Sequence, residues 1–179
     1  ISEVDRLMDV MVATSNNANT NVQMLGEAYK YVAASSKNFE SFENVNILLG
    51  ILADNGIKSG QAGRNLAEIY RRLANPSKEV ANALGDLNIQ LYDQHGKFKG
   101  LKAISDELKT ATANLTQEER NRYLAVISGG EGMKILSSIM GTTEENYNKV
   151  ANGVKNAKGA TDKFADEMEK VAHELYRLL

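Results

Sequence analysis

Residues 55–76, NGIKSGQAGRNLAEIYRRLANP, constrain the fold more than any other segment, because they read as one amphipathic helix with a breaker at each end. An Asn-Gly pair before the helix is typical of the C-terminus of a preceding helix. The Asn-Pro pair after it stops the helix, because a residue before proline avoids the α region. Between these breakers, apolar side chains recur with helical spacing: Ala62, Leu66, Ile69, Tyr70 and Leu73. The spacing predicts a helix over 60–74 with one buried face.

Helical periodicity continues through most of the chain, which contains only one proline. The apolar pattern predicts further helices at about 4–11, 22–32, 42–52, 77–84, 101–115, 117–128 and 133–140. Thr20 with Gln23, and Thr116 with Glu119, have the spacing of capping boxes at two of the helix starts. Gly85 is predicted to follow the last residue of the 77–84 helix. We therefore expect a mainly α fold, a module of many helices.

One segment departs from the helical pattern. In residues 87–99, LNIQLYDQHGKFK, the apolar residues Leu87, Ile89 and Leu91 alternate with polar ones. The sequence from Asp93 to Gly96 is typical of a turn, and another apolar residue follows it. The pattern predicts one small β-hairpin over about 87–99. An isolated hairpin is marginally stable in water, so this one is expected to lean on the helices.

The C-terminal part of the chain is predicted to be a single long helix. Thr142 with Glu145 has capping-box spacing, and apolar-leaning residues then follow at alternating intervals of three and four up to Leu178. The candidate helix-packing interface on this seam consists of Phe164, Met168, Val171 and Leu175. Two interpretations stay open: the helix packs on its own domain, or it leaves the domain and coils with copies of itself. We expect a helical core module over 1–141 and a long amphipathic helix over 142–179, which forms a coiled coil under the second interpretation.

Composition narrows the classes of function. The chain has no cysteine, which excludes disulfides, thiolate metal sites and cysteine nucleophiles. Charged residues are 25% and the net charge is −2, whereas nucleic-acid-binding modules usually carry a basic field, so we expect no bound nucleic acid. The longest apolar run, Ile47 to Ala53, is too short to span a bilayer. Because the chain begins at Ile1, we expect it to be an excerpt of a longer protein.

No motif in the sequence carries recognisable chemistry. His95 and His173 lie in different predicted elements, and neither has a partner at metal-ligand spacing. The sequence GIKSG at 56–60 lacks the order of a phosphate-binding loop. The acidic pairs at 118–119 and 144–145 fall in first helical turns, where negative charge favours the helix dipole. We expect no catalytic, cofactor-binding or metal-binding residues, no small-molecule substrate and no enzyme activity.

Several segments together resemble a known family. They are Asn19–Val32 (NTNVQMLGEAYKYV), Ile47–Pro76, Leu84–Asp93, Leu101–Leu108 and Thr116–Gly130. In this order they are similar to the core domain of phage tail tape-measure proteins, over about residues 18–141. The chain departs from the family pattern at Lys58-Ser59-Gly60, at Asn88, where a glycine is frequent, and at Phe39–Glu43.

The resemblance implies a structural role, because the family's core domain carries no known active site. Tape-measure proteins occupy the lumen of the phage tail, set its length and template assembly of the tail tube. The implied partners are tail-tube and distal-tail proteins and tail assembly chaperones. The apolar seam, rather than the resemblance, adds a homo-oligomer through the C-terminal helix as a further expected partner. The implied location is the lumen of the virion tail, after synthesis in the bacterial host cytoplasm. The alternatives are a segment of a virion-associated cell-wall hydrolase, or a helical scaffold module of the host.

Overall fold

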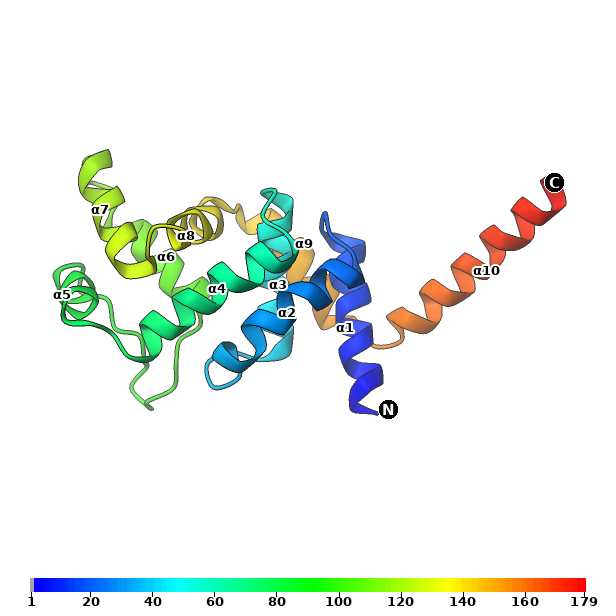
Figure 1. The fold of residues 1–179 in the computed structure, drawn as a ribbon, viewed down its shortest axis with the longest axis horizontal. Helices are drawn as coiled ribbons and strands as arrows, with labels where there is room; N and C mark the ends of the chain where they lie inside the picture. Colours follow the sequence, from blue (N-terminus) through cyan, green and yellow to red (C-terminus); the bar gives the residue numbers. More distant parts are fainter. Residues whose placement is uncertain (1) are drawn as a thin grey trace.

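The computed structural model describes residues 2–179, and within this range the chain is built from ten helices (Figure 1). They are α1 (Glu3–Asn17), α2 (Val22–Ser36), α3 (Phe42–Asp54), α4 (Ser59–Ala74), α5 (Lys78–Asp86), α6 (Leu101–Ala111), α7 (Gln117–Ser128), α8 (Gly132–Gly141), α9 (Glu144–Lys155) and α10 (Ala160–Leu178). Helices α1 to α9 form one body, and α10 projects from the end of that body where α1 lies (Figure 1). The mainly α prediction is therefore confirmed.

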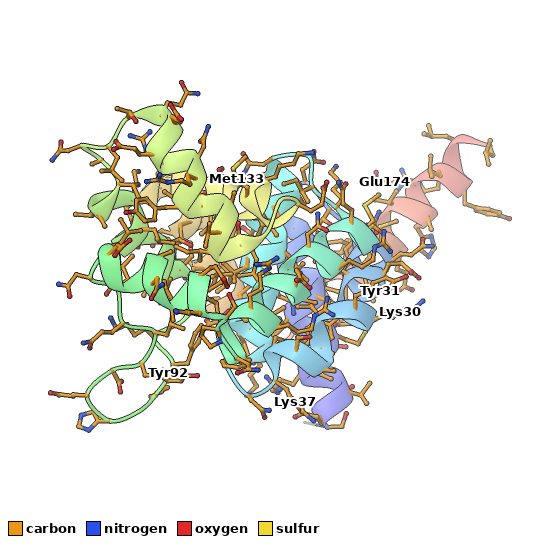
Figure 2. The ribbon with its side chains drawn as sticks, turned by 60° about the vertical axis from the view of Figure 1, so that its left-hand side comes forward. Lys30, Tyr31, Lys37, Tyr92, Met133 and Glu174 are labelled. Carbon is orange, nitrogen blue, oxygen red and sulfur yellow. The ribbon has the colours of Figure 1, made fainter. Side chains whose placement is uncertain are left out.

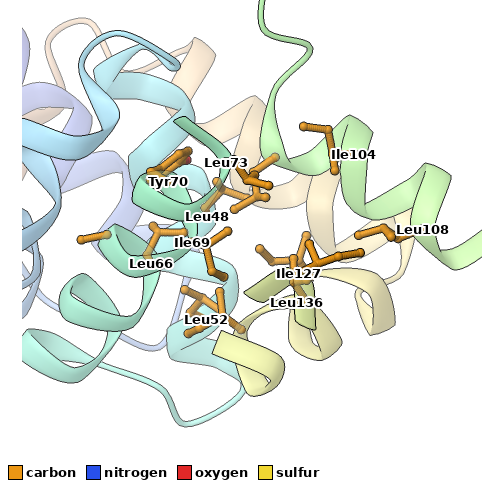
Figure 3. Close-up of a cluster of buried hydrophobic side chains, with 14 of the residues drawn as sticks. Leu48, Leu52, Leu66, Ile69, Tyr70, Leu73, Ile104, Leu108, Ile127 and Leu136 are labelled. Carbon is orange, nitrogen blue, oxygen red and sulfur yellow. The ribbon is translucent and has the colours of Figure 1, made fainter. Parts of the chain in front are cut away.

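The body contains two clusters of buried side chains that meet at α3. The larger cluster draws on α2 to α8, and Figure 3 shows its centre, where Leu66, Ile69 and Tyr70 of α4 meet side chains of α3, α6, α7 and α8. The smaller cluster lies between α1, α3 and α9. Helix α3 serves both clusters because every residue from 45 to 53 is buried, and all of them except Asn46 lack a polar side chain. None of the helices in residues 2–179 is long and apolar enough to cross a membrane.

Helices α2 and α4 make the closest helix pair, and Gly63 permits the approach. A Cβ atom placed on Gly63 would lie 2.1 Å from the carbonyl oxygen of Ala28. Any larger residue would therefore push the two backbones apart. This contact explains the Ala-Gly pair at 62–63 that begins the helix identified first in the sequence.

The predicted β-hairpin over 87–99 is wrong. Residues 87–100 form a loop with a single isolated bridge between Tyr92 and Phe98, and the described residues contain no strand. The turn is closed by the N–H of Asp93, which donates to the carbonyl of Lys97 at 2.8 Å. Ile89, Leu91 and Phe98 are buried in the larger cluster. The alternation of apolar residues therefore reflects a loop that faces helices on one side, and no ladder of backbone hydrogen bonds extends beyond the bridge.

The long C-terminal helix predicted over 142–179 is broken into two helices. Helix α9 ends at Lys155 and packs against α1 and α3, and α10 begins after Gly159, whose φ of 81° is left-handed. A residue in this conformation interrupts the helix, and glycine adopts it at the lowest cost. Only α10 therefore extends beyond the body.

Helix boundaries were predicted with mixed success. The capping box of Thr116 and Glu119 is present at the start of α7. The caps of α2 and α9 are Asn21 and Thr143, each one residue later than predicted. Gly85 lies inside α5, and the left-handed position after that helix is held by Asn88, with φ of 54°. Asparagine tolerates this conformation better than most residues, which explains how it stands where the family often has glycine.

Candidate functional site

The exposed apolar face of α10 is the most prominent surface feature of the described chain. The predicted interface residues Phe164, Met168, Val171 and Leu175 are 45%, 48%, 46% and 55% exposed, and α10 has no buried residue. The first and last of them are eleven helical steps apart, or about 17 Å at a rise of 1.5 Å per residue. Figure 1 shows that α10 points away from the helical body along this length. The structure thus brings the four residues onto one solvent-facing stripe.

Charged side chains flank this stripe in a regular order. In the heptad defined by Met168 and Val171, one edge carries Glu167 and Glu174 and the other carries Ala165 and Ala172. The basic residues lie on the outer face of the helix: Lys163, Lys170 and Arg177. The apolar face is therefore widened on the alanine edge and acidic on the other.

The body contains a polar contact centred on Glu40, whose side chain is mostly buried. This residue was not predicted from the sequence. Its carboxylate accepts hydrogen bonds from the Tyr70 hydroxyl and from the backbone N–H of Leu101, the latter at 3.0 Å. Burial raises the pKa of Glu40 above its ordinary value, and these donors oppose the shift only in part. Burial also raises the pKa of Tyr70 well above its usual value, and the neighbouring carboxylate adds to the effect.

Glu40 joins three parts of the body: the corner between α2 and α3, the C-terminal half of α4 and the start of α6. Phe39 beside it stacks on Tyr70 with ring centroids 6.1 Å apart, and meets Phe98 edge-to-face at 5.0 Å. Glu40 falls in the segment 39–43 where the sequence departs from the family pattern, and no periodicity marks it. The arrangement stabilises a joint between helices, and all of the carboxylate's observed partners are hydrogen-bond donors of the fold itself.

A charged network connects α6 with α9. The Lys102 ammonium lies 2.7 Å from Asp106 and 3.2 Å from Glu144, and 4.8 Å from the centroid of the Tyr147 ring. Burial by itself lowers the pKa of Lys102, but the hydrogen bonds that its ammonium donates to these two carboxylates outweigh burial and raise the pKa overall. One member of the 144–145 acidic pair thus takes part in a contact between helices.

The remaining residues considered for chemistry lie far apart in the fold. His95 lies in the tight turn of the 87–100 loop, and His173 lies on α10. In the 118–119 pair, Glu119 accepts the Thr116 N–H at 2.9 Å, and this hydrogen bond lowers the pKa of Glu119. The 56–60 segment is the turn between α3 and α4. Within residues 2–179, no three His, Asp or Glu side chains are grouped as metal ligands.

Three surface hollows accompany these features. The largest, 640 Å³, lies between residues 87–90 and α6, where the Lys99 ammonium and the Glu107 carboxylate form an ion pair at 2.9 Å. The other two, 440 Å³ and 380 Å³, lie beside the link between α9 and α10, and Lys158 lines both. None of the three contains histidine. Their linings are mixed polar and apolar surfaces where elements meet.

Comparison with known proteins connects this fold to phage tails. A family model described as phage-related minor tail protein matches residues 1–129. The tape measure protein of Pneumococcus phage Dp-1 is 32% identical over 169 residues, which cover 94% of this chain and 15% of that relative. A protein of Escherichia phage P2 named as a probable tape measure protein is 23% identical over 171 residues, covering 93% of this chain and 21% of that relative. No solved structure matches the chain.

The chain thus spans between a seventh and a quarter of the length of these curated relatives. The matches cover the segments that carry the resemblance to tape-measure proteins, and they extend that resemblance from residues 18–141 to nearly the whole chain. The family model covers well over half of the chain, which confirms the resemblance. On this evidence, the chain belongs to the family of phage-related minor tail proteins.

Proposed function

We propose that this chain is a module of a tape-measure protein, which occupies the lumen of a phage tail, sets its length and templates assembly of the tail tube. Membership of the minor tail protein family makes the chain a structural component of a phage tail that contacts other tail components. The observation that carries the finer proposal is the similarity to two tape-measure relatives over more than nine-tenths of the chain. The mechanism is steric: tail-tube subunits stack around the protein until it is covered.

The architecture supports a length-setting part that combines a folded body with an extended one. A chain of 179 residues that was helical throughout and fully extended would span about 270 Å. The folded body is shorter, because a compact module of this size is roughly 40 Å across by radius-of-gyration scaling. Helix α10 alone, with 19 residues, adds about 28 Å beyond the body. The contribution of this segment to tail length is expected between the compact and fully extended values.

An in-frame deletion in the phage tests the length-setting role. Removing the codons for these 179 residues from the full-length gene is expected to shorten the tail by about 40 to 270 Å, as measured on electron micrographs of purified particles. Tails of normal length would overturn the role of this segment as part of the ruler. Particles without tails would instead assign the segment to initiation of assembly.

We also propose that α10 pairs with α10 of further copies of this chain, in parallel. Its apolar stripe has no partner within the body, and burial of each such side chain contributes about 1.5–3 kcal/mol. In an antiparallel pair, the edges that carry Glu167 and Glu174 would face each other, and the like charges would repel. In a parallel pair, each acidic edge instead faces the alanine edge of its neighbour. The charge pattern therefore favours a parallel arrangement.

A pair of aspartate substitutions tests the association. The double variant Met168→Asp with Leu175→Asp should abolish association of the chain in sedimentation experiments, because it places charges in the seam. His173→Asp with Tyr176→Asp adds the same charge on the outer face and should leave association unchanged. Identical sedimentation of both double variants and the native chain would show that the seam is not an interface.

A single cysteine then tests the orientation, because the chain contains none. Under mild oxidation, Leu178→Cys near the end of α10 should form disulfide-linked chains in a parallel pair, where the two ends lie together. In an antiparallel pair the two cysteines lie at opposite ends of the seam. Association without cross-linking would therefore overturn the parallel arrangement.

The proposed partners and location follow from the same role. The chain is expected to contact tail-tube and distal-tail proteins in the lumen, and tail assembly chaperones before the tube forms. These partners would meet a folded body whose surface is mostly polar, with Tyr31 and Tyr92 among its few exposed large apolar side chains (Figure 2). Because α9 packs on α1 and α3, we propose that the folded module extends to the end of α9 and that α10 is a separate amphipathic segment.

A further inference from the structure

Helix α10 meets the body mainly at its first turn. Its principal contact is with α1, and its residues from 162 onward are exposed. Figure 1 shows α1 beside the start of α10, while the rest of α10 extends into solvent. The direction in which α10 leaves the body is therefore decided within a few residues around Gly159.

The first turn of α10 receives no cap from its own sequence. Its N-cap residue is Gly159, which has no side chain to accept a hydrogen bond from the free N–H groups of the turn. Asp9 of α1, about 150 positions earlier in the chain, supplies the acceptor instead. One carboxylate oxygen accepts the Gly159 N–H at 2.8 Å, and the other accepts the Thr161 N–H at 2.9 Å.

Asp9 occupies an unusual position for an acidic residue. It lies in the middle of α1 among inward-facing residues and is 7% exposed. Aspartate is a poor residue for a helix interior, because its side chain competes for backbone groups in other conformations. Arg6, one turn earlier on α1, forms ion pairs with Glu3 and Glu43 and not with Asp9. The two N–H groups at the start of α10 are thus the partners that account for a buried carboxylate here.

The link beside Asp9 has space around it. Lys158 lies between the two hollows described above, one of 380 Å³ that includes Asp9 and one of 440 Å³ that includes Gly159 and Phe164. Side chains do not fill the space on either side of the link. Packing alone therefore restrains the angle of α10 only weakly. The two hydrogen bonds add a stronger restraint, because they tie both Gly159 and Thr161 to one carboxylate of α1.

We propose that Asp9 is a latch that fixes the direction in which α10 leaves the body. With both hydrogen bonds made, α10 projects along one line. Without them, the chain around Gly159 becomes a hinge, and α10 samples a range of angles. The latch goes beyond the length-setting role and is independent of the pairing of α10, because Phe164, Met168, Val171 and Leu175 do not accept or donate these bonds.

Distance measurements between two spin labels test the latch. Cysteines at Lys30 on α2 and Glu174 on α10 give two exposed labelling sites, one on the body and one on the projecting helix (Figure 2). Dilution with unlabelled chain confines the measurement to one molecule. We expect one narrow peak for the otherwise native chain. We expect the peak to spread into a broad distribution in Asp9→Asn, since an amide oxygen and an N–H₂ group cannot accept both N–H groups. Asp166→Asn, an exposed acid-to-amide change on α10, is the matched control and should keep the narrow peak.

A second variant breaks the latch from the other side without touching α1. Thr161→Pro removes one donor N–H, and proline is tolerated in the first turn of a helix. We expect it to broaden the distance distribution as well, whereas Asp162→Pro, in the same turn but not bonded to Asp9, should not. Hydrogen exchange should show loss of protection at the Gly159 amide in both latch variants.

Three results would overturn the latch. The first is a broad distribution in the native chain. The second is a narrow native-like peak in both Asp9→Asn and Thr161→Pro. The third applies if Asp9→Asn does not fold: a narrow peak in Thr161→Pro alone would then show that the direction of α10 does not depend on these hydrogen bonds.

Discussion

Helices α4 and α10 look alike in sequence and differ entirely in their surroundings. Each carries one apolar stripe at helical spacing and a charged opposite face. In α4 the stripe is fully buried, with Leu66, Ile69 and Tyr70 at 0% exposure. In α10 the corresponding stripe is about half exposed along its whole length. An amphipathic helix therefore predicts that its apolar face is covered by another surface. It does not predict whether that surface belongs to the same chain or to another one.

The reason for the difference lies at the start of each helix. Helix α4 begins directly after the turn that follows α3, and Gly63 lets it lie against α2 at backbone contact. Helix α10 begins after a left-handed Gly159 that turns the chain away from the body, and it is held there by Asp9. Helix α4 is thus part of the core from its first turn, whereas α10 is attached at one end.

The largest expected effect on stability comes from truncating one leucine in each of the two apolar stripes. Leu66→Ala should lower the free energy of unfolding by about 2–5 kcal/mol, because it removes a fully buried side chain. Leu175→Ala in dilute, monomeric chain should change it by less than about 0.5 kcal/mol, as at an exposed surface site. Urea titration measures both. Equal losses at the two sites would mean that α10 folds back onto the body.

A smaller effect is expected from two glycines in the α2–α4 pair. Gly63→Ala should destabilise the chain by about 1–3 kcal/mol, because the new methyl group meets the Ala28 backbone. Gly26→Ala, on α2, has open space around it and should stabilise the chain by about 0.5–1 kcal/mol through helix propensity. Thermal unfolding distinguishes the two signs. Stabilisation by both substitutions would show that the helices can separate at little cost.

The pH dependence of stability tests the contact of Glu40 with Tyr70 of α4 and with the start of α6. Helix α10 has no such buried contact along its stripe. Because burial raises the pKa of Glu40 in the folded state, the folded chain holds this proton more tightly than the unfolded chain. The contribution of Glu40 is therefore most favourable below its unfolded pKa and is lost as pH rises through its folded pKa. Glu40→Gln does not titrate, so native stability should fall relative to this variant as pH rises through that window. Urea titrations across the range measure the difference, and Glu118→Gln on an exposed turn is the matched control.

The smallest expected effects concern helix starts. Thr116→Ala should lower the free energy of unfolding by about 0.5–2 kcal/mol, because the Thr116 side chain caps the N-terminus of α7. Thr20→Ala should cost less, because the cap of α2 is Asn21, whose side chain accepts the Met24 N–H at 2.8 Å. Equal losses in thermal unfolding would restore the cap to Thr20. These values also give a scale for the cap that Asp9 supplies to α10.

The sequence by itself determined the helical character of this chain, the approximate start of most of its helices, and its family. These properties depend on short-range patterns: the 3.6-residue period, caps at fixed spacing and breakers such as Asn-Pro. The same patterns identified Phe164, Met168, Val171 and Leu175 as one apolar face. All of this information lies within a few residues of the position it describes.

Only the tertiary structure decided which structural element each ambiguous pattern forms and which polar residues lie at contacts between helices. The alternation at Leu87, Ile89 and Leu91 came from a loop packed on helices, and a period of two cannot distinguish this from a strand. The seam over 142–179 became two helices because α9 found partners in α1 and α3. Glu40 and Asp9 acquired their roles from donors 61 and about 150 positions away. Such contacts are set by packing across the whole body, so no local pattern in the sequence records them.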